Sequence, residues 1–186
     1  NLKNDPEKIY DFFRDLGVYS FDFLLPDNNW TNPPYRRENN MPEYGMWLIK
    51  VFNKWMQENN SKVSIRILES IIRSQLGGNS LYESMTTEEI SLLTISTDGE
   101  YQGLDCLKSV PFQTYKTNKF VIDCEIEEVL DIPSIKLRTL GLNQLSQKCK
   151  NCSVLNTCGG GYFPHRFNFK NNFKNPSVYC KDLYYL

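Results

Sequence analysis

Apolar residues in the first eighty positions follow two alternating periods, one typical of helices and one typical of strands. The first helix is predicted to begin at Asp5, which can cap free backbone amides, and to end at Gly17, because glycine commonly terminates helices. Helices that alternate with strands indicate βα units with parallel strands. The expected elements are helix 5–17, strand 19–25, helix 42–59, strand 62–68 and helix 69–76.

Beyond residue 80 the elements become shorter. Residues 92–97 and 100–105 flank Asp98-Gly99, and this predicts a β-hairpin because the pair readily takes positive φ angles. The predicted fold class is therefore α/β followed by α+β, with a boundary within 77–89 that divides the chain into 1–80 and 81–186. The remaining expected elements are a strand over 120–124 and helices over 125–131 and 134–147, which Pro133 separates.

Length and composition limit the function. The chain has 186 residues, of which 40% are hydrophobic, so it can bury a core as one domain or two small ones. No stretch approaches the ~20 apolar residues of a membrane helix and no targeting segment is visible, so no membrane partner is expected. A formal net charge of -1 argues against nucleic acid as the main partner.

Four cysteines in the last quarter of the chain carry the strongest chemical signal. Cys149, Cys152, Cys158 and Cys180 are spaced as C-x2-C-x5-C-x21-C. The C-x2-C step lets two sulfurs converge while backbone amides point at the site, so the spacing predicts a metal centre. Two disulfides or four ordinary buried thiols are the alternatives. Disulfide frameworks are typical of short secreted chains, and thiols outside that context indicate a reducing cytoplasm.

The spacing favours an iron–sulfur cluster over zinc. Zinc sites usually place two short arms a dozen or more residues apart, whereas here the second arm overlaps the first. His165 is the single histidine, so few ligands exist for a mixed Cys/His site. Six basic residues and one acid between Lys148 and Asp182 give this stretch a charge of +5. Such a stretch would favour a negatively charged cluster, and a solvated basic face is the alternative.

These residues resemble a known family. The cysteine spacing, the glycine turn 159–161 and the segment 175–180 are similar to the SPASM domain of radical S-adenosylmethionine (radical SAM) peptide maturases. The resemblance implies that the four cysteines hold one auxiliary [4Fe–4S] cluster. The family usually supplies a further cysteine for a second cluster, and Tyr162 stands at that position here, so one cluster is carried over. The run 163–166 resembles FxsB-like and cyclophane-forming maturases of ribosomal peptides.

The resemblance also implies a fold. Residues 1–80 would be the C-terminal fragment of a radical SAM β/α barrel, formed by the last units of a partial (β/α)6 barrel. Residues 81–186 would be a β-hairpin followed by a small cysteine-rich helical SPASM domain. The C-x3-C-x2-C loop that binds the SAM-cleaving cluster is not in the sequence. The chain is therefore interpreted as the C-terminal part of an enzyme, inactive alone.

The complete enzyme would bind SAM and would crosslink or epimerise a ribosomally made precursor peptide by radical chemistry. Its partners would be that peptide, an N-terminal radical SAM half in the same or a separate chain, and an electron donor. Two alternatives remain open: a zinc-stabilised peptide-binding module, and a pseudoenzyme that keeps only the substrate-docking half.

Residues that follow the two N-terminal strands are candidates for the SAM or peptide site. Functional groups of a β/α barrel lie at the C-terminal ends of its strands, and ordinary loop residues are the alternative interpretation. The candidates are Pro26, Asp27, Asn29, Trp30 and Glu69.

Three further features around the cysteines have a functional and a structural interpretation. Glycines 159–161 would either aim backbone amides at cluster sulfurs or form a plain turn. His165 would shield the cluster or act as a structural hydrogen-bonding partner. Cys106 and Cys124 are interpreted as buried structural thiols.

Overall fold

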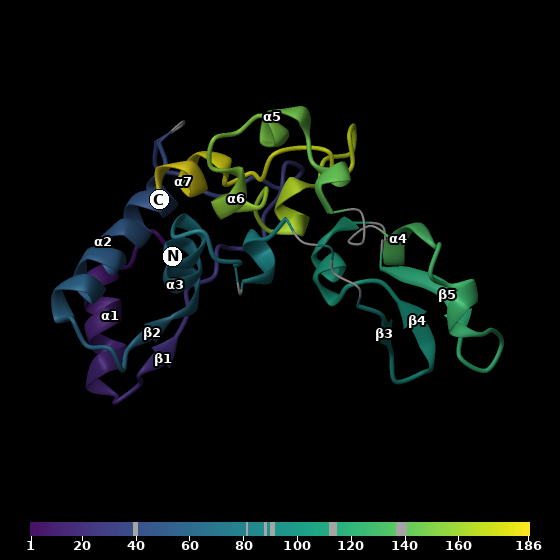
Figure 1. Cartoon of the computed structure of the whole chain (residues 1–186), viewed down its shortest axis with the longest axis horizontal. Coiled ribbons are helices and arrows are strands. Elements are labelled where there is room, and N and C mark those ends of the chain that lie inside the picture. Colours follow the sequence, from purple (N-terminus) through teal and green to yellow (C-terminus); the bar gives the residue numbers. More distant parts are fainter. Residues whose placement is uncertain (39–40, 81, 88, 90–91, 112–114, 137–140) are drawn as a thin grey trace.

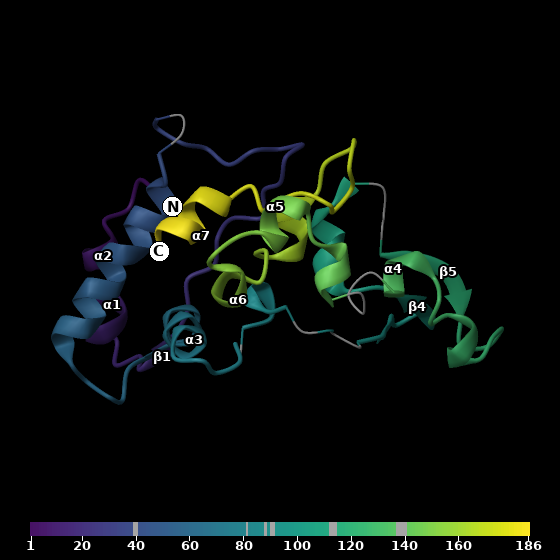
Figure 2. The same cartoon turned by 45° about the horizontal axis from the view of Figure 1, so that its top comes forward.

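The computed structural model describes residues 1–38, 41–80, 82–87, 89, 92–111, 115–136 and 141–186. It is a mixed α/β fold with helices and a small parallel sheet at one end and an antiparallel sheet at the other (Figure 1). The cysteine-rich segment lies between them, as Figure 2 also shows. None of the described helices has the length and apolar character needed to cross a bilayer.

The first helix confirms its predicted cap. α1 (Pro6–Asp15) begins after Asp5, whose side chain accepts hydrogen bonds from the backbone N–H groups of Glu7 and Lys8. Gly17 follows the helix with a φ of +74°, which a residue with a side chain rarely adopts. α2 (Glu43–Glu58) also lies where the sequence predicted it.

The two N-terminal strands pair in parallel as predicted, but both are shorter than expected. β1 (Ser20–Phe21) pairs with β2 (Ser64–Ile65), and α3 (Arg66–Gln75) begins directly after β2. The predicted extension of the second strand to residue 68 is therefore wrong. The cause is Asp22, whose carboxylate accepts from the backbone N–H of Ile67 at 3.1 Å and so starts the helix from the neighbouring strand.

The predicted hairpin is confirmed and gains a third strand. β3 (Thr94–Ile95) and β4 (Glu100–Gln102) are antiparallel, and β5 (Lys116–Phe120) pairs with β4. A strand over 120–124 was expected, and the structure contradicts it. The chain turns directly after Phe120, whose carbonyl accepts from the backbone N–H groups of Asp123 and Cys124.

Short helices replace the two longer ones predicted before the cysteines. The helix predicted over 134–147 is broken in the described residues, and its positions 137–140 lie outside them. Pro133 occupies the first position of α4 instead of separating two long helices. The 3₁₀ helices are η1 (Glu83–Met85), η2 (Asp105–Ser109), η4 (Ile126–Glu128), η5 (Gly141–Gln144) and η6 (Phe163–Arg166). The short α-helices are α4 (Pro133–Lys136), α5 (Gln147–Lys150), α6 (Leu155–Cys158) and α7 (Cys180–Tyr185).

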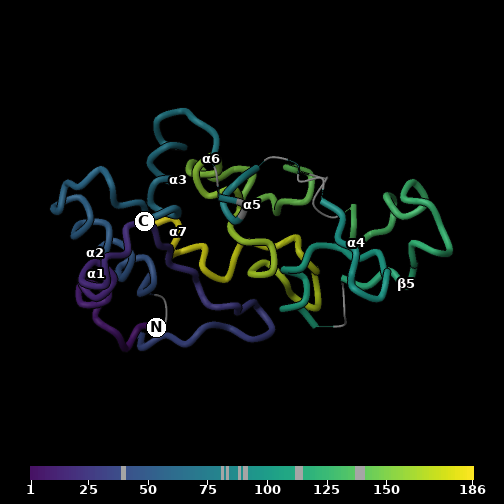
Figure 3. The backbone as a smooth tube through the Cα atoms, turned by 90° about the horizontal axis from the view of Figure 1, so that it is seen from below, coloured from purple at the N-terminus to yellow at the C-terminus, as the bar shows by residue number. Residues whose placement is uncertain are grey.

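The end of the chain returns to the N-terminal core. α7 packs on α2, and Figure 3 shows the C-terminal segment beside the N-terminal helices. Tyr179 and Leu183 are buried in the same core as Tyr10, Leu48 and Ile65. Two smaller hydrophobic cores are present. One lies between η2 and η6, and the other lies beside β4. The division into 1–80 and 81–186 stays a prediction.

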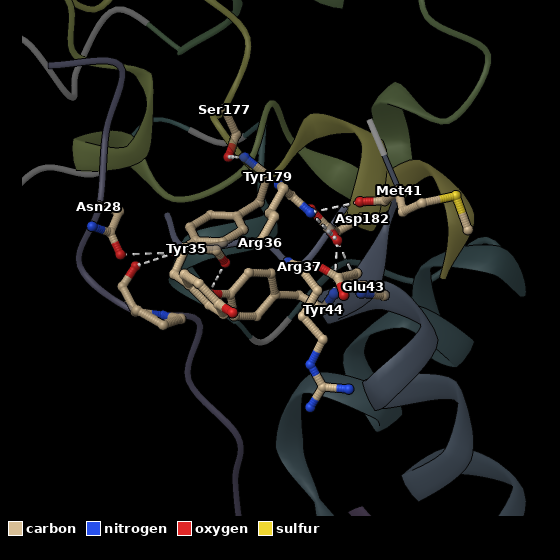
Figure 4. Close-up of polar contacts among 12 residues, drawn as sticks. Asn28, Tyr35, Arg36, Arg37, Met41, Glu43, Tyr44, Ser177, Tyr179 and Asp182 are labelled. Atoms are coloured by element: carbon tan, nitrogen blue, oxygen red, sulfur yellow. Dashed lines mark hydrogen bonds and ion pairs between the residues drawn. The ribbon is translucent and has the colours of Figure 1, made fainter. Parts of the chain in front are cut away.

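A buried ion pair fastens α7 to the start of α2 (Figure 4). Asp182 is only 1% exposed, and the guanidinium of Arg36 donates to both of its carboxylate oxygens. The same carboxylate accepts from the backbone N–H groups of Tyr44 at 2.9 Å and Gly45 at 3.1 Å. Pro42, at the cap position of α2, supplies no side-chain hydrogen bond. Asp182 therefore caps α2 from the far end of the sequence.

The ion pair also affects the titration of Arg36. The hydrogen bond and the charge of Asp182 raise the pKa of Arg36 above its ordinary value, with burial opposing. The ion pair therefore favours the charged form of Arg36.

We predict that Asp182→Asn destabilises the fold by about 3 kcal/mol, because it leaves the Arg36 guanidinium without its counter-ion in a buried site. Urea unfolding followed by circular dichroism measures this loss. Asp131→Asn is the matched control, since the ion pair of Asp131 with Lys136 is solvent-exposed. Equal unfolding midpoints for the two variants would contradict the prediction.

Candidate metal centre

The structure brings all four predicted ligands to one pocket of about 560 Å³. Cys149 lies in α5, Cys158 ends α6, and Cys180 is the first residue of α7, while Cys152 lies in the turn between α5 and α6. Figure 2 shows α5 and α6 in the middle of the molecule, with α7 to their left beside α2. Residues far apart in sequence thus surround a common volume.

Local hydrogen bonds hold the first two cysteines. The Ser146 hydroxyl caps α5 by accepting from the backbone N–H of Cys149 at 3.3 Å. The backbone N–H of Cys152 then donates to the Cys149 carbonyl at 3.0 Å, which turns the chain so that both side chains line the pocket. The C-x2-C step therefore forms the compact turn that its spacing predicts.

Glycine at position 159 is required by both conformation and space. Gly159 ends α6 with a φ of +59°, and a Cβ atom there would lie 2.4 Å from the backbone nitrogen of Thr86. The next amide, that of Gly160, is a hydrogen-bond donor to the Cys158 sulfur. The amide of one of the three glycines therefore lies at the sulfur of a candidate ligand, and the role of the glycine turn at a cluster stays a prediction.

The four thiols are free, and two of them have raised pKa values. None of them forms a disulfide. Burial raises the pKa of the Cys158 thiol to about 12, against the opposing effect of the Gly160 amide. Burial also raises the pKa of Cys180, and the nearby Lys148 ammonium opposes this. With a pKa of about 12, the Cys158 thiol is protonated at neutral pH, so binding of a metal there would release its proton.

The thiols surround a volume and do not converge on a point. Within the described residues, no three His, Cys, Asp or Glu side chains lie close enough together to ligate one metal ion. A tetrahedral zinc ion would need all four sulfurs about 2.3 Å from its centre. The choice between a single ion and a cluster therefore stays a prediction from the cysteine spacing. Lys148 and Lys181 line the same pocket and place positive charge beside it.

The other candidate site residues do not lie together in one pocket. Pro26 and Asp27 line a second pocket, of about 490 Å³. Glu69 lines a third pocket, of about 820 Å³, and accepts a hydrogen bond from Ser64 at 2.8 Å. The assignment of these three residues to a SAM or peptide site stays a prediction.

Two of the candidates, Asn29 and Trp30, make hydrogen bonds that fix loops of the fold. The buried Asn29 side chain accepts from the backbone N–H and the hydroxyl of Thr31. The Trp30 indole donates to the Pro176 carbonyl at 2.7 Å and ties its loop to the segment before Cys180. Their suggested role at the SAM or peptide site is not tested by these contacts and also stays a prediction.

Arg66 and Tyr82 also line the pocket of Pro26 and Asp27, and the sequence analysis did not identify either as a candidate site residue. Arg66 lies on its wall and packs its guanidinium over the ring of Tyr82 at 4.9 Å. Arg66 was expected inside a strand, and only the capping of α3 by Asp22 places it here. That contact joins residues 45 positions apart and leaves no local signal in the sequence.

His165 lines the pocket of Pro26 and packs on Tyr179, the residue directly before Cys180. Its buried ring contacts the rings of Tyr162 and Tyr179 at centroid distances of 5.0 and 4.8 Å, and it lines the pocket of Pro26. Burial lowers the pKa of His165 to about 4, and the nearby Pro26 carbonyl partly opposes this. Neither ring nitrogen makes a hydrogen bond of good geometry within the described residues. His165 is therefore neutral at physiological pH.

The two remaining cysteines are separate from the metal pocket. Cys106 packs on the core under η2, and Cys124 packs beside Tyr101 and Val129. Neither lines the 560 Å³ pocket. These surroundings agree with the structural interpretation of both residues.

Comparison with known proteins gives a likeness of fold. No protein-family model and no curated protein matches the sequence. The solved structure of native anSMEcpe with bound AdoMet has a TM-score of 0.70 and 19% sequence identity, covering 96% of this chain and 48% of that chain. Native anSMEcpe with AdoMet and the Cp18Cys peptide has a TM-score of 0.72 and 18% identity, covering 96% of this chain and 49% of that one.

The chain spans about half the length of these structures. anSMEcpe is a radical SAM anaerobic sulfatase maturase. The likeness supports the predicted relationship to radical SAM maturases at the level of the fold. The narrower assignment to FxsB-like or cyclophane-forming maturases and the details of the partial barrel and SPASM domain stay predictions.

We predict that His165 makes stability depend on pH between about 6.5 and 4. Its pKa in the folded chain, about 4, lies below the ordinary value of 6.5, so the unfolded chain takes up the proton first as pH falls. The stability that neutral His165 contributes is therefore complete above pH 6.5 and is lost toward pH 4. Between pH 7 and 4.5, wild type should lose on the order of 2 kcal/mol more than His165→Gln in urea unfolding. Parallel pH profiles would refute the assignment.

Proposed function

We propose that this chain is the C-terminal part of a radical SAM enzyme that modifies a ribosomally made peptide. We further propose that Cys149, Cys152, Cys158 and Cys180 hold an auxiliary [4Fe–4S] cluster. One observation carries the proposal: four cysteines with C-x2-C-x5-C-x21-C spacing line a single pocket in a fold that resembles half of a radical SAM maturase.

The residues present fit a cluster on three counts. Four thiols, none of them in a disulfide, provide one ligand for each iron. The Gly160 amide at the Cys158 sulfur and the ammonium of Lys148 would stabilise the negative charge of the ligated core. The overlapping C-x2-C-x5-C spacing, in a chain with a single histidine, favours a cluster over the zinc alternative.

The four proposed ligands lie on segments that differ in how they are attached to the rest of the fold. Cys149, Cys152 and Cys158 lie on short helices and turns of one segment. Cys180 begins α7, which the buried Asp182 carboxylate fixes to α2 two residues later. Cysteine ligation of every iron leaves none open to substrate, so the bound cluster would supply electron transfer or structural support.

The pocket of Pro26 and Asp27 is the proposed place for SAM or peptide. Its walls combine apolar side chains with the Asp27 carboxylate, the Arg66 guanidinium and the neutral ring of His165. anSMEcpe, the structural neighbour, binds both AdoMet and a peptide. In the complete enzyme, Asn29, Trp30 and Glu69 would support the loops around this site. The radical step itself requires the N-terminal half, and reduction of the clusters requires an electron donor.

The modification proposed is radical-mediated crosslinking or epimerisation of a precursor peptide, as in FxsB-like and cyclophane-forming maturases. A reducing cytoplasm would suit a protein that depends on unoxidised thiols. A zinc-stabilised binding module and a pseudoenzyme are the two outcomes that the following test separates from this proposal.

We expect anaerobic reconstitution with iron and sulfide to yield a coloured protein with about four irons and four sulfides per chain. Serine substitution at Cys149, Cys152, Cys158 or Cys180 should remove most of this iron. Cys106→Ser and Cys124→Ser are matched controls that should keep full loading, because both residues lie outside the pocket.

One equivalent of zinc in a colourless protein would overturn the cluster proposal. Loading that survives substitution of Cys180 would overturn the ligand set. A chain that loads iron fully but never supports turnover with any radical SAM half would instead match the pseudoenzyme.

A further inference from the structure

The pocket that Pro26 and Asp27 line has an apolar wall built from distant parts of the sequence. Its volume is about 490 Å³. Ile67 of α3, Met85 of η1 and Leu183 of α7 line it, and all three are buried in the N-terminal core. A bound group can therefore lay an apolar stem against these side chains and remove it from water.

The charges of this pocket do not balance. Two charged residues line it, Asp27 and Arg66. The Arg66 guanidinium is already engaged, because it pairs with the Asp22 carboxylate at 3.0 Å and lies over the Tyr82 ring. The Asp27 carboxylate forms no ion pair or hydrogen bond in the part of the chain that the structure describes. The pocket therefore presents one uncompensated negative charge from its described residues.

The backbone on both sides of Asp27 is held in place. The Tyr179 hydroxyl lies 3.0 Å from the Pro26 carbonyl and 3.3 Å from Oδ1 of Asn28, and the close-up in Figure 4 includes the contact between Tyr179 and Asn28. The backbone N–H of Asn28 also donates to the Pro26 carbonyl at 2.7 Å. Asp27 thus lies on a fixed loop, so little further ordering of that loop is needed when its carboxylate binds a partner.

His165 adds unused hydrogen-bonding capacity to the same pocket. Its ring is only 2% exposed, and neither ring nitrogen makes a hydrogen bond of good geometry within the described residues. A neutral imidazole has one acceptor nitrogen and carries no charge that would repel a cation. An acceptor nitrogen and a carboxylate both favour a bound group that is rich in N–H donors.

We infer that this pocket binds a basic side chain of the peptide, a lysine or an arginine. The stem would lie against Ile67, Met85 and Leu183, and the charged end would pair with the Asp27 carboxylate. The inference rests on the proposed function and deepens it, because it names the part of the substrate that the SAM or peptide site would hold.

SAM is the other source of positive charge, on its sulfonium and ammonium groups. The amino-acid end of SAM also carries a carboxylate, which Asp27 would repel. Arg66, the cation that could accept this carboxylate, is paired with Asp22. A side chain that carries positive charge alone therefore fits the pocket better.

The test titrates N-acetyl-lysine amide and N-acetyl-norleucine amide into the full 186-residue chain and follows binding by NMR. Norleucine keeps the apolar stem of lysine and lacks the ammonium group, so the comparison isolates the charge. We expect the lysine compound to bind about fivefold more tightly, as for an ion pair at a partly exposed site. The arginine compound should show a similar preference over norleucine.

Asp27→Asn should abolish this preference, so that the lysine and norleucine compounds bind within about twofold of each other. Asp123→Asn is the matched control and should keep the full preference, because Asp123 is also an exposed loop carboxylate and does not line the pocket. The comparison of the two compounds in wild type needs no variant, so it holds even if a substitution disturbs folding.

Three results would overturn the inference. They are equal binding of the two compounds by wild type, a lysine preference that survives Asp27→Asn, and displacement of the lysine compound by SAM that binds at least about tenfold more tightly. The iron content of the same samples keeps the two proposals apart. A chain that loads its cluster and shows no lysine preference contradicts this inference alone, whereas an Asp27-dependent preference in a chain that takes up no iron contradicts the cluster alone.

Discussion

The carboxylate of Asp182 holds the two ends of this chain together. It pairs with Arg36 and caps the first turn of α2 through the amides of Tyr44 and Gly45. A buried carboxylate is costly unless its lone pairs are filled, and here four donor groups fill them. The position of Cys180, two residues before Asp182, depends on this contact. The contact that caps α2 thereby also positions a candidate metal ligand at the start of α7.

The pocket lined by Cys149, Cys152, Cys158 and Cys180 has a volume of about 560 Å³, which would leave room for the proposed cluster. The surroundings oppose ionisation of the thiols, since burial raises the pKa of Cys158 and Cys180. Only a strongly attracting cationic centre would displace those protons. The Gly160 amide and Lys148 would then stabilise the thiolates.

The segment between residues 158 and 180 also connects the two pockets. His165 and Tyr179 lie ring to ring, and the Tyr179 hydroxyl donates to the Pro26 carbonyl at 3.0 Å. The Trp30 indole reaches the Pro176 carbonyl from the same side of the N-terminal unit. The loop after β1 is therefore anchored on the residues that lead into Cys180.

The sequence by itself determined several local elements and indicated which cysteines are candidate ligands. Asp5 and Gly17 bound α1, Asp98-Gly99 turns the hairpin, and the cysteine spacing indicated which thiols belong together, because each signal lies within a few neighbouring residues or in ligand chemistry. Tertiary structure decided what depends on distant contacts. Asp22 starts α3 three residues earlier than its own sequence suggests, and the chain turns after Phe120 where a strand was expected. Burial made His165 neutral, and Asp182 joined α7 to α2. Such effects come from residues brought together only by folding, so no local pattern records them.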